Sequence, residues 1–197
     1  MSNAPPLHAS GMPDRRRAPR IAPLSPDIYP TSASPAPRVA LDELKSRPVK
    51  PGQASFFFFD HHFQYNAVKV LPGEYYVSHE DLVIMTVLGS CIAACLWDSR
   101  MRVGGMNHFM LPEGDSLDVS GRYGSYAMEL LINEMLKLGA VKSPMKARLY
   151  GGANMNPDLA PIGSGNAAFA RAFLAAEGIP KVHEDLEGSH ARRVEFR

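Results

Sequence analysis

Residues 82–97 form the longest uncharged stretch of the sequence, and they constrain the fold more than any other segment. The stretch is sixteen residues long and is interrupted by Thr86 and by Gly89-Ser90. A transmembrane helix needs about 20 apolar residues, so this stretch is too short to span a membrane. Its β-branched and other apolar residues instead predict two buried strands joined by a tight turn.

The turn between these strands carries a cysteine, and a histidine follows on the next extended segment. Cys91 comes directly after Gly89-Ser90, and His108 lies seventeen positions later, within the predicted strand 103–111. A single cysteine among apolar residues is most often core filler, because burial raises the pKa of a thiol and makes it inert. A turn glycine before the thiol and an imidazole nearby favour a nucleophile with its base, with backbone N–H groups close to the sulfur.

The second cysteine, Cys95, has only apolar neighbours and is predicted to be a buried, inert thiol. In an extended strand the two Cα atoms would lie about 13 Å apart, too far for a disulfide. A zinc site made of Cys91, Cys95 and His108 would lack a clear fourth ligand and a C-x₂-C spacing, so we expect no metal and no cofactor.

The first 54 residues differ in composition from the rest. They contain 11 of the 17 prolines and one of the 17 aromatic residues, with eight basic and four acidic side chains. Such a segment buries too little apolar surface to offset its ordering entropy, so residues 1–54 are predicted to be a disordered Pro/Arg-rich tail. Residues 55–197 then carry a net charge of −3, since the whole chain is +1, which argues against nucleic-acid binding.

The tail also bears on where the protein is found. Its arginine cluster at residues 15–17 is not followed by the apolar segment that an export signal needs. The sequence therefore predicts a cytoplasmic protein without stable membrane insertion.

From residue 55 onward, extended and helical patterns alternate. Amphipathic periodicity predicts a helix at 125–138, and Asn166 is expected to be the N-cap of a second helix at 166–177. A Gly-, Ser- and Asp-rich segment at 112–123 is predicted to be a surface loop. The remaining strands are expected at 56–59, 68–71, 75–77, 82–87, 92–97, 103–111, 147–150, 182–186 and 193–196. This order indicates an α+β domain in which helices cover a sheet.

Other polar motifs have ordinary explanations. The pair Gly151-Gly152 after a strand could cradle an anion, but it more often allows close backbone packing. His61, His62 and His183 are expected at the surface or in satisfied core positions.

Several short motifs together resemble one known family. They are Pro72-Gly73-Glu74-Tyr75, Leu88-Gly89-Ser90-Cys91, Asn107 to Pro112, Gly151-Gly152-Ala153, Ile162-Gly163 with Asn166, and Glu184-Asp185-Leu186 followed by Gly188 and Arg192-Arg193-Val194. In this order they resemble the CheD family of chemoreceptor glutamine deamidases over residues 55–197. The tail lies outside the resemblance.

The resemblance implies a three-layer α/β/β fold and a Cys/His/Thr site, with Cys91 as nucleophile and His108 as base. The family pattern has a threonine six positions before the cysteine, where this chain has Met85, and Thr86 comes one position later. Because neighbouring strand residues face opposite sides, we expect Thr86 to serve only if a bulge or turn re-aims it.

The implied activity is that of a protein-glutamine glutaminase, an amidohydrolase that converts receptor glutamines to glutamates through a cysteine thioester. A thiolate–imidazolium pair of Cys91 and His108 would attack the amide, and the same route could serve receptor methyl esters. The implied partners are the cytoplasmic helices of chemoreceptors and, in some relatives, the CheC phosphatase. Two alternatives stay open, a different cysteine-dependent amide hydrolase and a non-catalytic chemotaxis adaptor that binds receptor or CheC.

Overall fold

The computed structural model describes residues 38–111, 117–155 and 161–197. For residues 117–122 it describes the backbone alone. Its nine strands form two sheets, and three helices accompany them within the described residues. The four-stranded sheet has the order β1-β2-β4-β9 and contains β1 (Phe56–Asp60), β2 (Tyr65–Lys69), β4 (Val83–Leu88) and β9 (Arg192–Phe196). The five-stranded sheet has the order β3-β6-β5-β7-β8 and contains β3 (Tyr75–Ser78), β5 (Ile92–Asp98), β6 (Val103–Asn107), β7 (Lys146–Gly151) and β8 (Lys181–Leu186).

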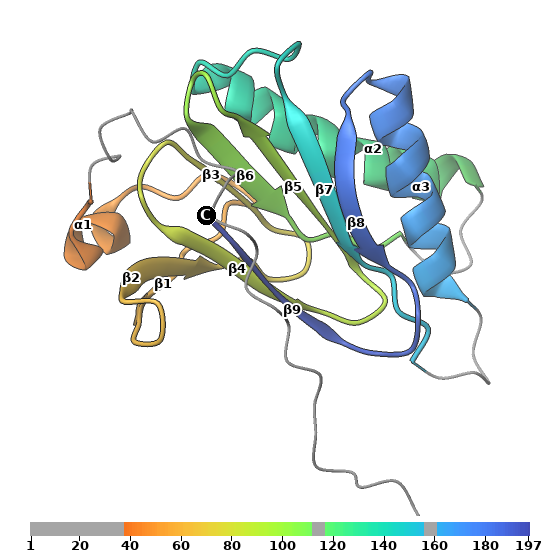
Figure 1. The fold of residues 1–197 in the computed structure, drawn as a ribbon, viewed down its shortest axis with the longest axis horizontal. Coiled ribbons are helices and arrows are strands. Elements are labelled where there is room, and N and C mark those ends of the chain that lie inside the picture. Colours follow the sequence, from red (N-terminus) through yellow and green to blue (C-terminus); the bar gives the residue numbers. More distant parts are fainter. Residues whose placement is uncertain (1–37, 112–116, 156–160) are drawn as a thin grey trace, which may run out of the picture. The chain divides into compact units, whose positions relative to one another are not determined.

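The layers follow from the alternation of side chains along β5. Ile92, Ala94 and Leu96 face α2 (Leu117–Lys137) and α3 (Ile162–Ala176), and together they form one apolar core. Ala93 and Cys95 face the other way, toward the four-stranded sheet, and belong to a second core between the sheets. The domain is therefore α+β with a three-layer α/β/β arrangement, as predicted (Figure 1).

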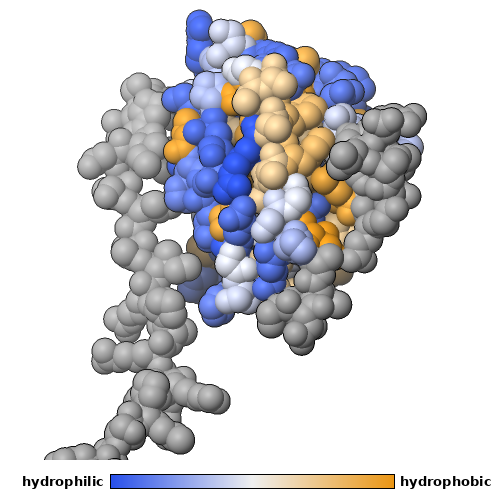
Figure 2. Space-filling view, turned by 90° about the vertical axis from the view of Figure 1, so that its right-hand side faces the viewer, coloured by the Kyte–Doolittle hydropathy of each residue, from blue (hydrophilic) through white to orange (hydrophobic). Residues whose placement is uncertain are grey.

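The strands expected from the sequence are confirmed in number and order, with shifted ends. The largest shift is at the end of β6, which stops at Asn107 with only a single bridge continuing it at Phe109, while β2 lies a few residues before the expected 68–71. Figure 2, which views the side that carries α3, shows a band of hydrophobic residues beside a hydrophilic one.

Both long helices begin earlier than predicted. Of the loop expected at 112–123, residues 112–116 lie outside the described residues, whereas 117–123 are helical, so that prediction is wrong for them. Gly124, just after the segment predicted as a loop, has a packing role: a Cβ on it would lie 2.6 Å from side-chain atoms of Leu111 and Phe169. Glycine permits this close approach of α2 to α3 at a cost in helix propensity.

The folded part of the chain also begins before residue 55. Residues 38–54 are described, and α1 (Leu41–Ser46) buries Leu44 to 1% exposure in the core between the sheets. The predicted tail boundary at residue 54 is therefore wrong for this segment, because one well-placed leucine anchors a stretch whose overall composition is polar. Disorder of residues 1–37 stays a prediction, since they lie outside the described residues.

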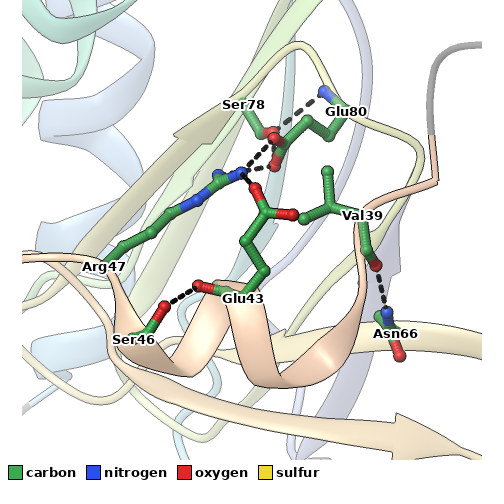
Figure 3. A network of polar contacts seen from close by, with 7 residues as sticks. All are labelled: Val39, Glu43, Ser46, Arg47, Asn66, Ser78 and Glu80. Atoms are coloured by element: carbon green, nitrogen blue, oxygen red, sulfur yellow. Dashed lines mark hydrogen bonds and ion pairs between the residues drawn. The ribbon is translucent and has the colours of Figure 1, made fainter.

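Polar contacts fix the same segment to the domain (Figure 3). Arg47 lies between two carboxylates, donating to Glu43 at 2.9 Å and to Glu80 at 2.7 and 3.0 Å. The carbonyl of Val39 accepts a hydrogen bond from the side chain of Asn66 on β2 at 2.7 Å. Farther along, Lys50 pairs with Glu134 on α2.

Among the described residues, no helix is long and apolar enough to cross a membrane.

Candidate active site

Cys91 occupies the turn between β4 and β5, at the point where the chain passes from one sheet to the other. Its side chain is half-buried and belongs to the core between the sheets. Two backbone hydrogen bonds hold the turn: the carbonyl of Gly89 accepts from Ala153 N at 2.9 Å, and the carbonyl of Cys91 accepts from Gly152 N at 2.8 Å. The nucleophile predicted from the sequence is therefore a fixed residue at the edge of a core.

The pair Gly151-Gly152 makes this attachment possible. Gly151 has a φ of +107°, and a Cβ placed on it would lie 2.1 Å from the carbonyl oxygen of Cys91. A Cβ on Gly152 would lie 2.8 Å from the carbonyl oxygen of Gly163 at the start of α3. These contacts support the close-packing interpretation of the two glycines, because no larger residue fits between the strand end, the turn and the helix.

His108 lies on the same side of the five-stranded sheet as Cys91. Reciprocal backbone bonds between Ile92 and Phe109, at 2.8 and 2.9 Å, continue the β5–β6 register, in which Cys95 pairs with Met106. This register places His108 opposite Ala93, so that Cys91 is its diagonal neighbour on the face between the sheets. The imidazole is 3% exposed.

Thr86 reaches the site from the opposite sheet. It alternates with Ile84 and Leu88 on the inner face of β4, whereas Val83 and Met85 belong to a cluster on the outer face. The register of β4 with β9 is regular from Ile84 to Leu88. The expectation that Thr86 needs a bulge or turn to reach the site is therefore wrong: an ordinary strand presents it inward.

The hydrogen bonds of Thr86 fix the proton on His108. Thr86 Oγ1 donates its one hydrogen to the carbonyl of Val70 at 2.7 Å, so it must accept from Nδ1 of His108, 2.8 Å away. Nδ1 then carries the proton and Nε2 has a free lone pair. Within the described part of the chain, Nε2 is buried and has no hydrogen-bond partner, which leaves it available as a base.

Burial keeps this pair neutral. It raises the pKa of the Cys91 thiol, an effect partly offset by the cysteine's own backbone N–H. It also lowers the pKa of His108, against a smaller opposite effect of the Val70 carbonyl. Both shifts disfavour the thiolate–imidazolium pair that we expected, because desolvation penalises the charged form of each group. Burial therefore favours a neutral thiol beside a neutral imidazole.

The remaining candidates from the sequence lie elsewhere. Cys95 is fully buried, and burial raises the pKa of its thiol far above the usual range. His61 and His62 are exposed in the turn after β1, and His183 is exposed on β8, where its ring lies 5.9 Å from that of Tyr150. The described residues contain no group of three His, Cys, Asp or Glu side chains that could hold a metal ion.

One residue of the site was assigned a different role by the sequence. Asn166 is not an N-cap, because α3 begins at Ile162 and Asn154 accepts from Gly163 N near its start at 3.0 Å. Asn166 lies inside the helix at 1% exposure, where it accepts from Leu111 N at 2.9 Å and donates to the carbonyl of Ser90 at 2.8 Å. The signal available in the sequence for this role was an asparagine next to Ala167, on the face of the helix that is buried.

Comparison with known proteins gives consistent relatives. The sequence model of the CheD family, described as CheD chemotactic sensory transduction, matches residues 110–197. A protein of Albidiferax ferrireducens named "Probable chemoreceptor glutamine deamidase CheD 1" is 57% identical over 171 residues, which are 86% of this chain and 73% of that protein. A protein of Methylobacillus flagellatus named "Probable chemoreceptor glutamine deamidase CheD" is 46% identical over 159 residues, which are 77% of this chain and 78% of that protein.

Solved structures add little. The Bacillus licheniformis hypothetical protein YfiH aligns over 58% of this chain and 49% of its own with 12% identity and a TM-score of 0.38, too low to bear on fold or function. The two sequence relatives are matched over more than two thirds of their lengths, at 57% and 46% identity. The motifs and the layers of this chain resemble the same family. This chain belongs to the CheD family.

Proposed function

We propose that the protein hydrolyses the side-chain amide of specific chemoreceptor glutamines to glutamate, with Cys91 as nucleophile, His108 as base and Thr86 as the group that orients His108. The names of the two relatives point to this reaction. The observation that carries the assignment of residues is the hydrogen bond from His108 Nδ1 to Thr86, which leaves Nε2 unprotonated on the face that it shares with Cys91.

The first half of the reaction forms a thioester. Nε2 of His108 takes the proton of the Cys91 thiol as the sulfur attacks the amide carbon, and the carbonyl electron pair moves to oxygen. His108 then gives that proton to the amide nitrogen, the C–N bond breaks, and ammonia leaves. Since burial favours the neutral pair, proton transfer accompanies the attack instead of preceding it.

Backbone N–H groups of the turn would stabilise the oxyanion. The structure gives the N–H groups of Ser90 and Cys91 no acceptor among the described residues. One donor to an oxyanion contributes about 2.7–4 kcal/mol in known cases. Two such donors next to the sulfur suit a tetrahedral intermediate formed on it.

The second half releases the product. His108 takes a proton from water as the water oxygen attacks the thioester, the C–S bond breaks, and His108 returns that proton to the departing sulfur, which gives glutamate and the Cys91 thiol. Each event adds a negative charge to a receptor helix and creates a carboxylate that a methyltransferase could esterify. Binding of a CheC phosphatase and cleavage of receptor methyl esters stay predictions from the resemblance.

The experiment is mass spectrometry of a purified chemoreceptor after incubation with the protein. We expect amide-to-acid conversion at particular glutamines with the natural sequence and with Cys95→Ser, and none with Cys91→Ala. Free glutamine serves as a competing substrate. Conversion of free glutamine without conversion of receptor would favour a different amide hydrolase, and conversion of neither would favour the adaptor.

A further inference from the structure

The three carbonyls of the nucleophile turn are each held by a different group. Those of Gly89 and Cys91 accept from the backbone N–H groups of Ala153 and Gly152. The carbonyl of Ser90, between them, is held by a side chain, that of Asn166 at 2.8 Å. A side chain therefore controls the one peptide plane that lies directly before the sulfur-bearing residue.

That plane also carries a possible oxyanion donor. In a planar trans peptide, the carbonyl of one residue and the N–H of the next point in opposite directions. With the Ser90 carbonyl directed to α3, the N–H of Cys91 points away from the helix. This N–H has no hydrogen-bond acceptor in any other described residue.

We infer that Asn166 is a positioning residue, which locks the Ser90–Cys91 peptide so that the Cys91 N–H faces the oxyanion of the tetrahedral intermediate. The inference rests on the proposed function, since it concerns the same site. Without the amide of Asn166, the peptide could rotate and present the Ser90 carbonyl to the oxyanion, replacing a stabilising donor with a repelling acceptor.

The second hydrogen bond of Asn166 anchors its side chain to the segment that follows His108. Its Oδ1 accepts from Leu111 N at 2.9 Å, three residues after His108. One buried amide thus joins the turn of the nucleophile to the segment that follows the base. Because both of its bonds are to backbone atoms and it is 1% exposed, Asn166 has little freedom to turn.

The test separates an oxyanion effect from loss of the turn. Alkylation of a thiol by iodoacetamide develops no oxyanion, whereas amide hydrolysis does. We expect Asn166→Ala to lower kcat for receptor deamidation by about 10²–10³, the usual effect of one lost oxyanion donor. The KM and the rate of Cys91 alkylation should stay within about threefold of their original values, because substrate contacts and the thiol are retained.

Two results would overturn the inference. One is a folded Asn166→Ala protein with unchanged kcat. The other is an alkylation rate that falls in parallel with kcat, which would mean that Asn166 only keeps the turn in place.

Asn166→Asp provides a second variant if the alanine protein does not fold. A protonated aspartic acid can donate to the Ser90 carbonyl, but an ionised one offers acceptors alone. The activity of this variant relative to the natural sequence should therefore fall as pH rises. A ratio that does not change with pH would contradict the inference.

Asn154→Asp is the matched control, because it adds the same charge near the same helix. Asn154 bonds to Gly163 N and to Ser164 Oγ and does not touch the Ser90 carbonyl. Its deamidation rate should stay within about threefold, with no pH-dependent ratio.

Turnover of p-nitrophenyl acetate by all variants keeps the two claims apart: if receptor is not a substrate, the proposed function fails, while the role of Asn166 is still measured on the ester.

Discussion

At the scale of single residues, the proposed chemistry depends on which nitrogen of His108 carries the proton. Thr86 decides this, because its own hydrogen is used on the Val70 carbonyl and it can only accept from Nδ1. Thr86→Val keeps the shape and removes the acceptor, so kcat should fall by about tenfold to 100-fold, as for other lost orienting partners. Thr86→Ser keeps the hydroxyl and should retain most activity. Steady-state kinetics of both variants check this, and equal losses would show that the hydroxyl is not what matters.

The roles of Cys91 and His108 predict a larger loss. Replacing either by alanine should lower deamidation by several orders of magnitude, up to about 10⁶, since members of a catalytic unit are not additive. Cys95→Ser is the control: it changes a fully buried thiol and should reduce thermal stability while leaving the rate per folded molecule unchanged. Substantial turnover by Cys91→Ala would refute the mechanism.

The pKa shifts predict how Cys91 reacts in the absence of substrate. Burial raises the pKa of the thiol and lowers that of His108, so it favours the neutral pair near pH 7. Alkylation by iodoacetamide should be slow there and should accelerate as pH rises beyond the ordinary thiol value of about 8.5. Rates measured by intact mass from acid to alkaline pH test this. A fast rate that is level across neutral pH would instead show a thiolate–imidazolium pair.

At the scale of secondary-structure elements, the segment before β1 behaves as part of the domain. Leu44 on α1 is 1% exposed, so Leu44→Ala should lower the free energy of unfolding by about 2–5 kcal/mol. Val49 is 54% exposed, and Val49→Ala should change stability little. Denaturant unfolding of both proteins gives the comparison.

Truncation tests the same segment in another way. A chain that starts at residue 38 should unfold like the full chain and deamidate at a similar rate. A chain that starts at residue 55 lacks Leu44 and the ion pairs of Arg47 and Lys50, and it should be less stable. Equal stability of the two truncated chains would show that residues 38–54 contribute nothing.

Sequence patterns predicted most elements because hydrophobic periodicity is a local property. They failed where a residue's role depends on distant neighbours. The contact of Gly124 on α2 with Phe169 on α3 is invisible in the local sequence, and the start of α2 was predicted too late. Asn166 suggested a cap because its partners, Ser90 and Leu111, are more than fifty residues away. The polar composition of residues 1–54 did not indicate α1 for the same reason, because Leu44 is buried by core residues that are distant in the sequence.

At the scale of the whole molecule, the site exists because two sheets face each other. Cys91 and His108 come from the five-stranded side and Thr86 from the four-stranded sheet, so no single element contains the constellation. The turn and the spacing in the sequence predicted the dyad of Cys91 and His108. It could not establish which face Thr86 occupies, because that depends on the register of β4 against its neighbours and on the sheet packed over it.

The most direct test of the mechanism is to trap the acyl-enzyme. A receptor peptide containing a modified glutamine is mixed with the protein, the reaction is stopped with acid within its first turnovers, and the protein is digested and mapped by mass spectrometry. We predict the peptide linked through its glutamyl carbonyl to Cys91, with ammonia lost, and no such adduct in Cys91→Ala. An adduct on Cys95 or on another nucleophile, or formation of glutamate at an undiminished rate by Cys91→Ala, would contradict the account.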